Sequence, residues 1–234
     1  MNVTDLLNSA LENFNKNMGI TLENHNIDIS ALITKIDVID NWSKIKSDLN
    51  CIKVLDEVKY DLITSIQFAS MGIYRNAFIS LRSALELGIG FISFVDNNYK
   101  YLLWIKNEDN ITWASLKDKE KGVLSKKYIT LFLDVNEDIV DTINIKADES
   151  YSICSEYVHG KYNFMQTLNC NKLIYDKEKF NLFLSTLNNI MEILNLLYSI
   201  RFKEDINLLG EENKLVLEEL LGKFELREVA LDGE

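Results

Sequence analysis

The sequence contains no proline and only 9 glycines in 234 residues. Proline is common in turns and interrupts helices, and glycine supplies the positive φ angles of tight turns. Their scarcity argues against a loop-rich β-sandwich or barrel. The three cysteines include no CxxC pair and are too few for a disulfide scaffold, so we expect free thiols in a reducing compartment. These absences favour a globular chain made mainly of helices.

Sites that need special residue types are also poorly represented. Two histidines nearly exclude a histidine-ligated metal, and no GxxxxGK[ST], GxGxxG, HExxH or GxSxG motif occurs, so we predict neither a metal nor a cofactor. The N-terminus lacks the basic and apolar regions of a signal peptide, and the longest apolar run, residues 87–95, is too short to span a bilayer. We therefore expect a cytoplasmic protein that does not associate with membranes.

Acidic residues outnumber basic ones and are concentrated near the C-terminus. The net charge is −11, and residues 203–234 hold 10 acidic but only 4 basic side chains. Phosphate binding needs a basic face, so nucleic acid would have to bind at a local site. The segment 211–228 combines this acidity with an apolar stripe, which suggests a helix that packs on the bundle, on a second subunit or on a protein partner.

Apolar residues recur at helical spacing along most of the chain. Residues 74–95 are apolar nearly all round, which predicts a central, buried helix. We predict an all-α fold: a single helical-bundle domain with N-terminal helices packing on it (residues 1–57), a core (58–206) and an acidic C-terminal helical extension (207–234). Only residues 135–145 could be either strand or helix. The other helices are expected at residues 3–14, 30–49, 53–71, 149–166, 176–206 and 211–228.

Two of the four arginines lie in the predicted central helix. Arg75 and Arg82 are seven residues apart and share a face, and Glu86 follows Arg82 by four residues. Because an unpaired buried guanidinium is costly, Arg82 needs an anion. That anion could be Glu86 in a structural clamp, another carboxylate, or a phosphate on a ligand.

A second polar cluster lies on one face of a later predicted helix. Tyr151, Ser155 and His159 are spaced by four residues. A histidine on a half-polar face is suited to acid or base catalysis near neutral pH, but it could equally be a hydrogen-bonded core residue. The other histidine, His25, lies in a polar segment that we expect to be exposed.

Three short motifs resemble the HEPN superfamily of small helical-bundle proteins: GIYRNA at residues 72–77, LRSALE at 81–86 and EYVHG at 156–160. The resemblance covers roughly residues 58–205 and implies a bundle of four or five helices that forms a homodimer. Many members are metal-independent ribonucleases in toxin–antitoxin, phage-defence or CRISPR systems, whereas others bind nucleotides or partners without catalysis.

The family's catalytic signature, an arginine followed after four to six residues by histidine, is only half present. His159 matches the histidine, but positions 152–154 hold Ser, Ile and Cys. A cation from the central helix, Arg82 or Arg75, could replace the missing arginine. RNA cleavage needs a base, an acid and a cation on the phosphate.

The resemblance therefore implies specific roles at an RNA or nucleotide site. His159, Arg82 and Tyr151 would carry the chemistry. The flanking positions expected to contact the substrate are Arg75, Glu86, Ser155 and Tyr157.

Two other functions fit the same residues. In the first, the protein is a non-catalytic interaction module, and the Arg82–Glu86 and Tyr151–Ser155–His159 groups form a polar network that fixes the register of the helices. In the second, Arg75, Arg82 and His159 line a pocket for a small anionic ligand. An open cleft shared by Arg82 and His159 would favour catalysis or ligand binding, and a fully buried, fully hydrogen-bonded network would favour the interaction module.

Overall fold

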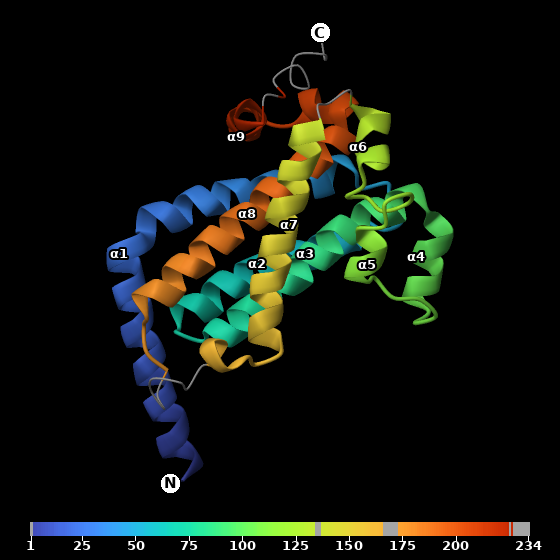
Figure 1. Ribbon diagram of the computed structural model, residues 1–234. Helices are drawn as coiled ribbons and strands as arrows, with labels where there is room; N and C mark the ends of the chain where they lie inside the picture. Colours follow the sequence, from blue (N-terminus) through green and yellow to red (C-terminus); the bar gives the residue numbers. More distant parts are fainter. Residues whose placement is uncertain (1, 134–136, 166–172, 225, 227–234) are drawn as a thin grey trace.

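The computed structural model describes residues 2–133, 137–165, 173–224 and 226, and within these residues it contains helices and no strand (Figure 1). The predicted all-α, single-domain fold is thus confirmed. Several expected features lie outside the described residues. They are the start of the segment 135–145, Cys170, and the ends of the helices predicted at 149–166 and 211–228. The elements are α1 (Val3–Ile45), α2 (Lys53–Ser70), α3 (Tyr74–Asp96), α4 (Asn98–Ile105), α5 (Trp113–Leu116), α6 (Lys126–Phe132), α7 (Glu137–Val158), η1 (Tyr162–Phe164), α8 (Lys177–Arg201), η2 (Lys203–Leu208) and α9 (Glu211–Lys223).

The N-terminal segment is one helix of 43 residues, although the sequence pattern predicted two helices with a break between them. The polar stretch in its middle stays helical because its inward side chains find distant partners. Asn17 Nδ2 donates to the Met71 carbonyl at 2.8 Å, and Asn17 Oδ1 accepts from the Tyr175 N–H at 3.0 Å. His25 is buried, with Nε2 2.8 Å from the Tyr175 hydroxyl, so the expectation that it is exposed was wrong.

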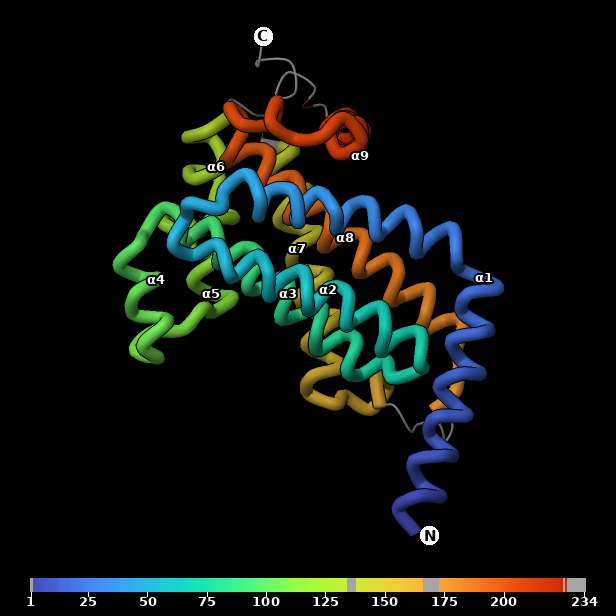
Figure 2. Tube along the Cα trace, turned by 180° about the vertical axis from the view of Figure 1, so that it is seen from behind, coloured from blue at the N-terminus to red at the C-terminus, as the bar shows by residue number. Residues whose placement is uncertain are grey.

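Helices α2 and α3 form an antiparallel hairpin, and α3 is the central helix of the bundle, as predicted (Figures 1 and 2). The turn between them needs Gly72, whose φ is +80° and whose position leaves no room for a side chain. α3 also packs closely on α8. A Cβ at Gly88 would lie 2.6 Å from Leu194, and the Tyr198 hydroxyl donates to the Gly88 carbonyl at 3.0 Å.

The composition of α3 follows from this central position. By length and apolarity alone it could cross a membrane, but 61% of the relevant window is buried inside the bundle. The core helix of a water-soluble protein has the same properties.

The C-terminal helix α9 packs on its own bundle. Leu217, Leu220 and Leu221 are buried, so its apolar stripe is covered within the chain and its acidic face points outward. Lys223 of α9 also lies 3.5 Å from the buried Glu192 of α8. The expected boundary between the N-terminal helices and the core, at residues 57 and 58, falls inside α2. The expected boundary between the core and the C-terminal extension, at residues 206 and 207, falls inside η2.

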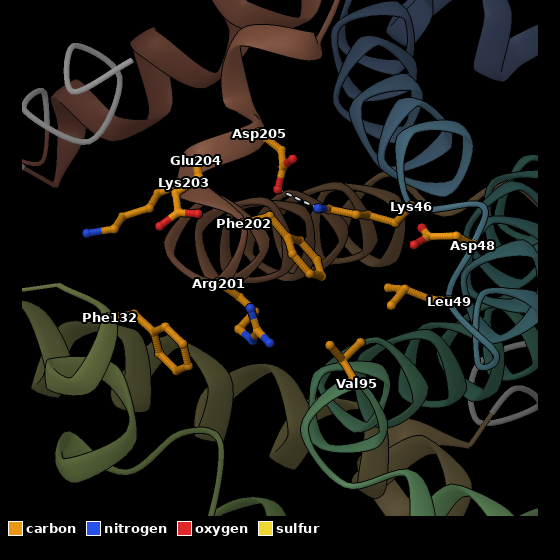
Figure 3. Close-up of a pocket in the computed structure, with 10 residues that line it drawn as sticks. All are labelled: Lys46, Asp48, Leu49, Val95, Phe132, Arg201, Phe202, Lys203, Glu204 and Asp205. Carbon is orange, nitrogen blue, oxygen red and sulfur yellow. Dashed lines mark hydrogen bonds and ion pairs between the residues drawn. The ribbon is translucent and has the colours of Figure 1, made fainter. Parts of the chain in front are cut away.

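A cavity of 360 Å³ lies where α1, α3, α6 and α8 end (Figure 3). Lys46 Nζ and Arg201 Cζ lie 5.0 and 5.5 Å from the centre of the Phe202 ring. Each cation has its own carboxylate, because Lys46 pairs with Asp205 and Arg201 binds Asp96 at 2.8 Å. Three basic and three acidic side chains line the cavity, so the charges of its lining balance.

Candidate functional site

One face of α3 is left partly open to solvent and carries the arginines singled out in the sequence. Arg75 and Ile79 are exposed, and Arg82, Ser83 and Glu86 are half-buried. These positions are spaced by three or four residues and therefore form one stripe. Helix α7 packs against α3 beside this stripe, so residues separated by about 80 positions in the sequence become neighbours.

Arg82 is held in the middle of this contact by two partners. Its Nη2 donates to the Tyr151 hydroxyl at 2.7 Å and lies 3.5 Å from the Glu86 carboxylate. Its guanidinium carbon is 4.7 Å from the centre of the Tyr151 ring. Burial raises the pKa of Glu86, against the opposing effect of the Arg82 charge. Arg82 thus links α3 to α7 through a compact, partly exposed polar network.

Tyr151 is fixed in turn by Trp113, whose ring stacks on it with centres 4.2 Å apart and planes 4° from parallel. The Trp113 indole N–H donates to Asp148 Oδ1 at 3.2 Å, and Lys117 pairs with the same carboxylate. The short helix α5 is therefore anchored to α7 beside Arg82, which explains why a tryptophan stands at this point of an otherwise polar loop.

Helix α7 ends in a turn that displays His159. The Lys161 N–H bonds to the Glu156 carbonyl at 3.1 Å and the Gly160 N–H to the Tyr157 carbonyl at 3.2 Å, which is the pattern of a Schellman cap. Gly160 adopts the required left-handed conformation, with φ of +61°. His159 is the C-cap residue and is exposed, and its imidazole has no hydrogen bond or ion pair to any described residue.

Arg75 is the arginine that reaches this turn. Its Nη2 donates to the Val158 carbonyl at 3.1 Å, directly before His159, and its guanidinium also lies over Gly160. Tyr151, the partner of Arg82, lies eight residues before His159, which corresponds to about 12 Å along a helix. Of the two arginines considered from the sequence, Arg75 is therefore the one that contacts the turn of His159, and Arg82 is the one that contacts Tyr151.

The other two predicted positions on α7 have structural contacts. Tyr157 is buried and its ring stacks on Phe78, with centres 4.0 Å apart, and burial raises the pKa of its hydroxyl to about 12. Ser155 donates from Oγ to the Tyr151 carbonyl of the preceding turn at 2.7 Å. Neither residue is among those that line the pocket beside Arg82.

That pocket has a volume of 380 Å³ and extends along the open stripe of α3 to Val158. Its opposite wall comes from the end of α4 and the loop that follows, through Trp104, Asn110 and Ile111. Sequence reasoning missed this wall, because a loop carries no periodicity that would indicate which way its side chains point.

Within the described ranges, no group of three or more His, Cys, Asp or Glu residues could hold a metal ion. The candidate site consists of the Arg75 and Arg82 guanidinium groups, the His159 imidazole, the Glu86 carboxyl group and the Trp104 ring. In comparisons with models of protein families, with curated proteins and with solved structures, no match to this chain was found. The similarity to the HEPN superfamily stays a prediction that rests on the three short motifs.

Proposed function

We propose that this protein binds and cleaves RNA at the corner where α3 meets the end of α7, without a metal ion. One observation carries the proposal: the Arg75 guanidinium rests on the Val158 carbonyl, one residue before the exposed imidazole of His159. An exposed guanidinium and an exposed imidazole thus come to the same turn from two helices, and imidazole is the side chain most often used for acid–base catalysis.

The chemistry follows from these two groups. In the cleavage of RNA by its own 2′-hydroxyl, a base removes the proton from that hydroxyl, and the oxygen attacks phosphorus. The bond to the 5′-oxygen breaks, leaving a cyclic phosphate and a free 5′-hydroxyl. His159 either removes the proton from the 2′-hydroxyl or donates one to the leaving 5′-oxygen, and water exchanges the other proton. Arg75 binds the phosphate oxygens whose charge increases in the transition state.

The pocket beside Arg82 provides the rest of the binding surface. Arg82 supplies a second positive charge for the backbone, and the Trp104 ring at the opposite wall offers a surface on which a base stacks. Tyr151 positions Arg82 through their hydrogen bond. Salt is expected to weaken binding, because backbone contacts through arginine release counterions.

The test is degradation of a labelled single-stranded RNA by purified wild type, His159→Ala, His159→Gln and Arg75→Ala. We expect both His159 variants to lose at least about 100-fold in rate. Arg75→Ala should lose about 10- to 1000-fold. Lys127→Ala is the matched control, because Lys127 is an exposed cation on the distant helix α6. Circular dichroism checks that all variants fold.

The outcomes separate catalysis from binding. Cleavage that is lost in the His159 variants but kept in the control supports the proposal. Wild-type protein that degrades no RNA in EDTA or with added divalent ions, at low and at moderate salt, overturns the catalytic part. If it also fails to bind RNA by fluorescence anisotropy, the whole proposal fails.

A role in a toxin or phage-defence system is part of the same proposal. Expression of the wild type in a bacterial host should then arrest growth, and His159→Ala should relieve the arrest at equal protein levels. Growth that is equally impaired by both forms would argue against this role.

A non-catalytic interaction module is the second candidate, and the Arg82 network favours it. Arg82 bonds to Tyr151 and pairs with Glu86, and Trp113 stacks on Tyr151, so the network links three helices as a register-fixing network does. This function is preferred if RNA is neither bound nor cleaved while Arg82→Ala lowers the stability of the fold.

A further inference from the structure

The first turns of α1 carry large apolar side chains into solvent. Val3 is 72% exposed, Leu6 55%, Leu7 61% and Leu11 57%. Figures 1 and 2 show these turns extending beyond the rest of the bundle, with the N-terminus at their free end. A contiguous patch of this kind is uncommon on a protein that acts alone in water.

These side chains form one stripe, together with the half-buried Ala10 and Phe14. At 100° per residue the stripe covers one side of the helix, and Asp5 and Glu12 lie on the other side. One turn further along, Asn17 and Thr21 continue the stripe and are buried against the bundle of the same chain. The packing face of α1 therefore runs past the edge of the bundle and ends without a partner among the described residues.

The stripe is self-complementary. From Asn2 to Asn15, the order of apolar and polar residues reads the same in both directions. If two copies of this segment lie antiparallel with a two-fold axis level with Asn8 and Ser9, every apolar residue faces an apolar residue of the other copy. The facing pairs are Val3 with Phe14, Leu6 with Leu11, and Leu7 with Ala10.

A second copy of the chain is therefore the occupant that fits this surface. A two-fold interface requires that the same patch pair with itself, and this segment meets that requirement at each apolar position. The stripe holds no charged side chain that would select an acidic or a basic partner. The segment extends from the bundle, so its apolar stripe is accessible to a second copy.

We propose that two copies of this protein associate through antiparallel pairing of residues 3–14 of α1. The contact involves about three helical turns, so it lies at or below the lower end of the roughly 1,200–2,000 Å² typical of stable interfaces. The dimer should therefore form reversibly, with a dissociation constant between about 1 and 100 µM. This inference does not depend on the RNA site.

Sedimentation equilibrium of the full chain over this concentration range tests the proposal. Leu7→Glu places a charge at the centre of the stripe and should weaken the dimer at least about 10-fold. Glu12→Gln is the matched control, because it changes the opposite face of the same turns, and it should dimerise as the wild type does. Since Leu7 is largely exposed, the variant keeps its fold, which circular dichroism verifies.

Two results would overturn the proposal. A wild type that remains monomeric throughout the range has no such interface. A dimer that Leu7→Glu leaves unchanged uses another surface. Either outcome would remove the α1 pairing and leave the RNA-cleavage experiment unaffected.

Cross-linking tests the antiparallel register. Leu7→Cys and Ala10→Cys proteins, each also carrying Cys170→Ser, are mixed and mildly oxidised, while the two other cysteines are buried. Antiparallel pairing places position 7 opposite position 10, so the mixed cross-link should form faster than either homodimeric one. If the homodimeric cross-links form faster than the mixed one, the pair is parallel and the proposed register is overturned.

Discussion

The Arg82 guanidinium donates a 2.7 Å hydrogen bond to the Tyr151 hydroxyl and thereby joins the middle of α3 to the middle of α7. The same tyrosine is stacked on Trp113. One side chain of α7 thus connects the central helix with the short helix α5. Two members of this network, Arg82 and Glu86, also line the pocket.

Removing only the Tyr151 hydroxyl tests how much this bond contributes. Tyr151→Phe keeps the ring stack but leaves Arg82 with Glu86 as its remaining partner, so the free energy of unfolding should fall by about 1 kcal/mol. Urea denaturation measures the change. Tyr162→Phe is the control, because Tyr162 is 73% exposed, and it should be neutral. Equal stability of both variants would mean that the bond contributes nothing net.

The turn that carries His159 depends on Gly160. With φ of +61°, this position disfavours any residue with a Cβ, so Gly160→Ala should destabilise the protein by about 1 kcal/mol. Space is not the cause, because the new Cβ would lie 3.6 Å from the nearest Arg75 atom.

Gly19→Ala is the matched comparison for Gly160→Ala. Gly19 lies within α1, and no neighbouring side chain or packed helix comes within 4 Å of the place that a Cβ would take, so alanine should stabilise the helix by about 0.5–1 kcal/mol. Thermal or urea unfolding compares the two variants directly. Changes of the same sign would contradict the assigned backbone conformations.

Glu192 of α8 is buried among cations from three other helices. It accepts from Lys146 at 2.6 Å and lies 3.5 Å from Lys223 and 3.8 Å from Lys35. Glu192→Gln leaves these ammonium groups without their shared anion and should destabilise the fold by about 2–4 kcal/mol. Glu219→Gln, at a carboxylate that is 75% exposed, should change stability by less than about 0.5 kcal/mol.

The pH dependence of the stability of Glu192→Gln gives an independent check. Burial by itself would raise the pKa of Glu192, but the hydrogen bond and the charge of Lys146 outweigh it and hold the pKa below its usual value. A carboxylate with a lowered pKa stabilises the fold above its unfolded pKa and loses that contribution as the pH falls through the folded pKa. The difference between wild type and Glu192→Gln should therefore be largest near neutrality and shrink below about pH 4. A constant difference would contradict this assignment.

Two cysteines should be chemically inert while the protein is folded. Burial raises the pKa of the Cys51 thiol to about 11 and that of Cys154 to about 12, so almost no reactive thiolate exists at about pH 8. In a Cys170→Ser background, iodoacetamide should label neither thiol in native buffer and both in urea, as measured by mass spectrometry. Rapid labelling of the native protein would show that one of these sites opens readily.

Much of the architecture was predictable because the information is local. The apolar periodicity of residues 74–95 indicated a buried central helix, and α3 is that helix. The break expected in α1 was wrong for a non-local reason. Its polar middle is stabilised by Met71 and Tyr175, which are about 50 and 150 residues away in the sequence.

The candidate site was predictable only in part for the same reason. Residue types and helical phase identified Arg75, Arg82, Tyr151 and His159. They could not decide which arginine meets which partner, because that depends on how α3 and α7 cross. The structure pairs Arg82 with Tyr151 and Arg75 with the turn of His159.

The sequence alone determined that this protein is a bundle of helices, since helix formation depends on side chains three and four residues apart. It also determined which side chains could bind a phosphate or transfer a proton. Only the tertiary structure decided which of these groups share a surface and where the packing face of α1 is left uncovered. Those contacts join residues far apart in the chain. They are selected by burial of the common core, to which the whole sequence contributes.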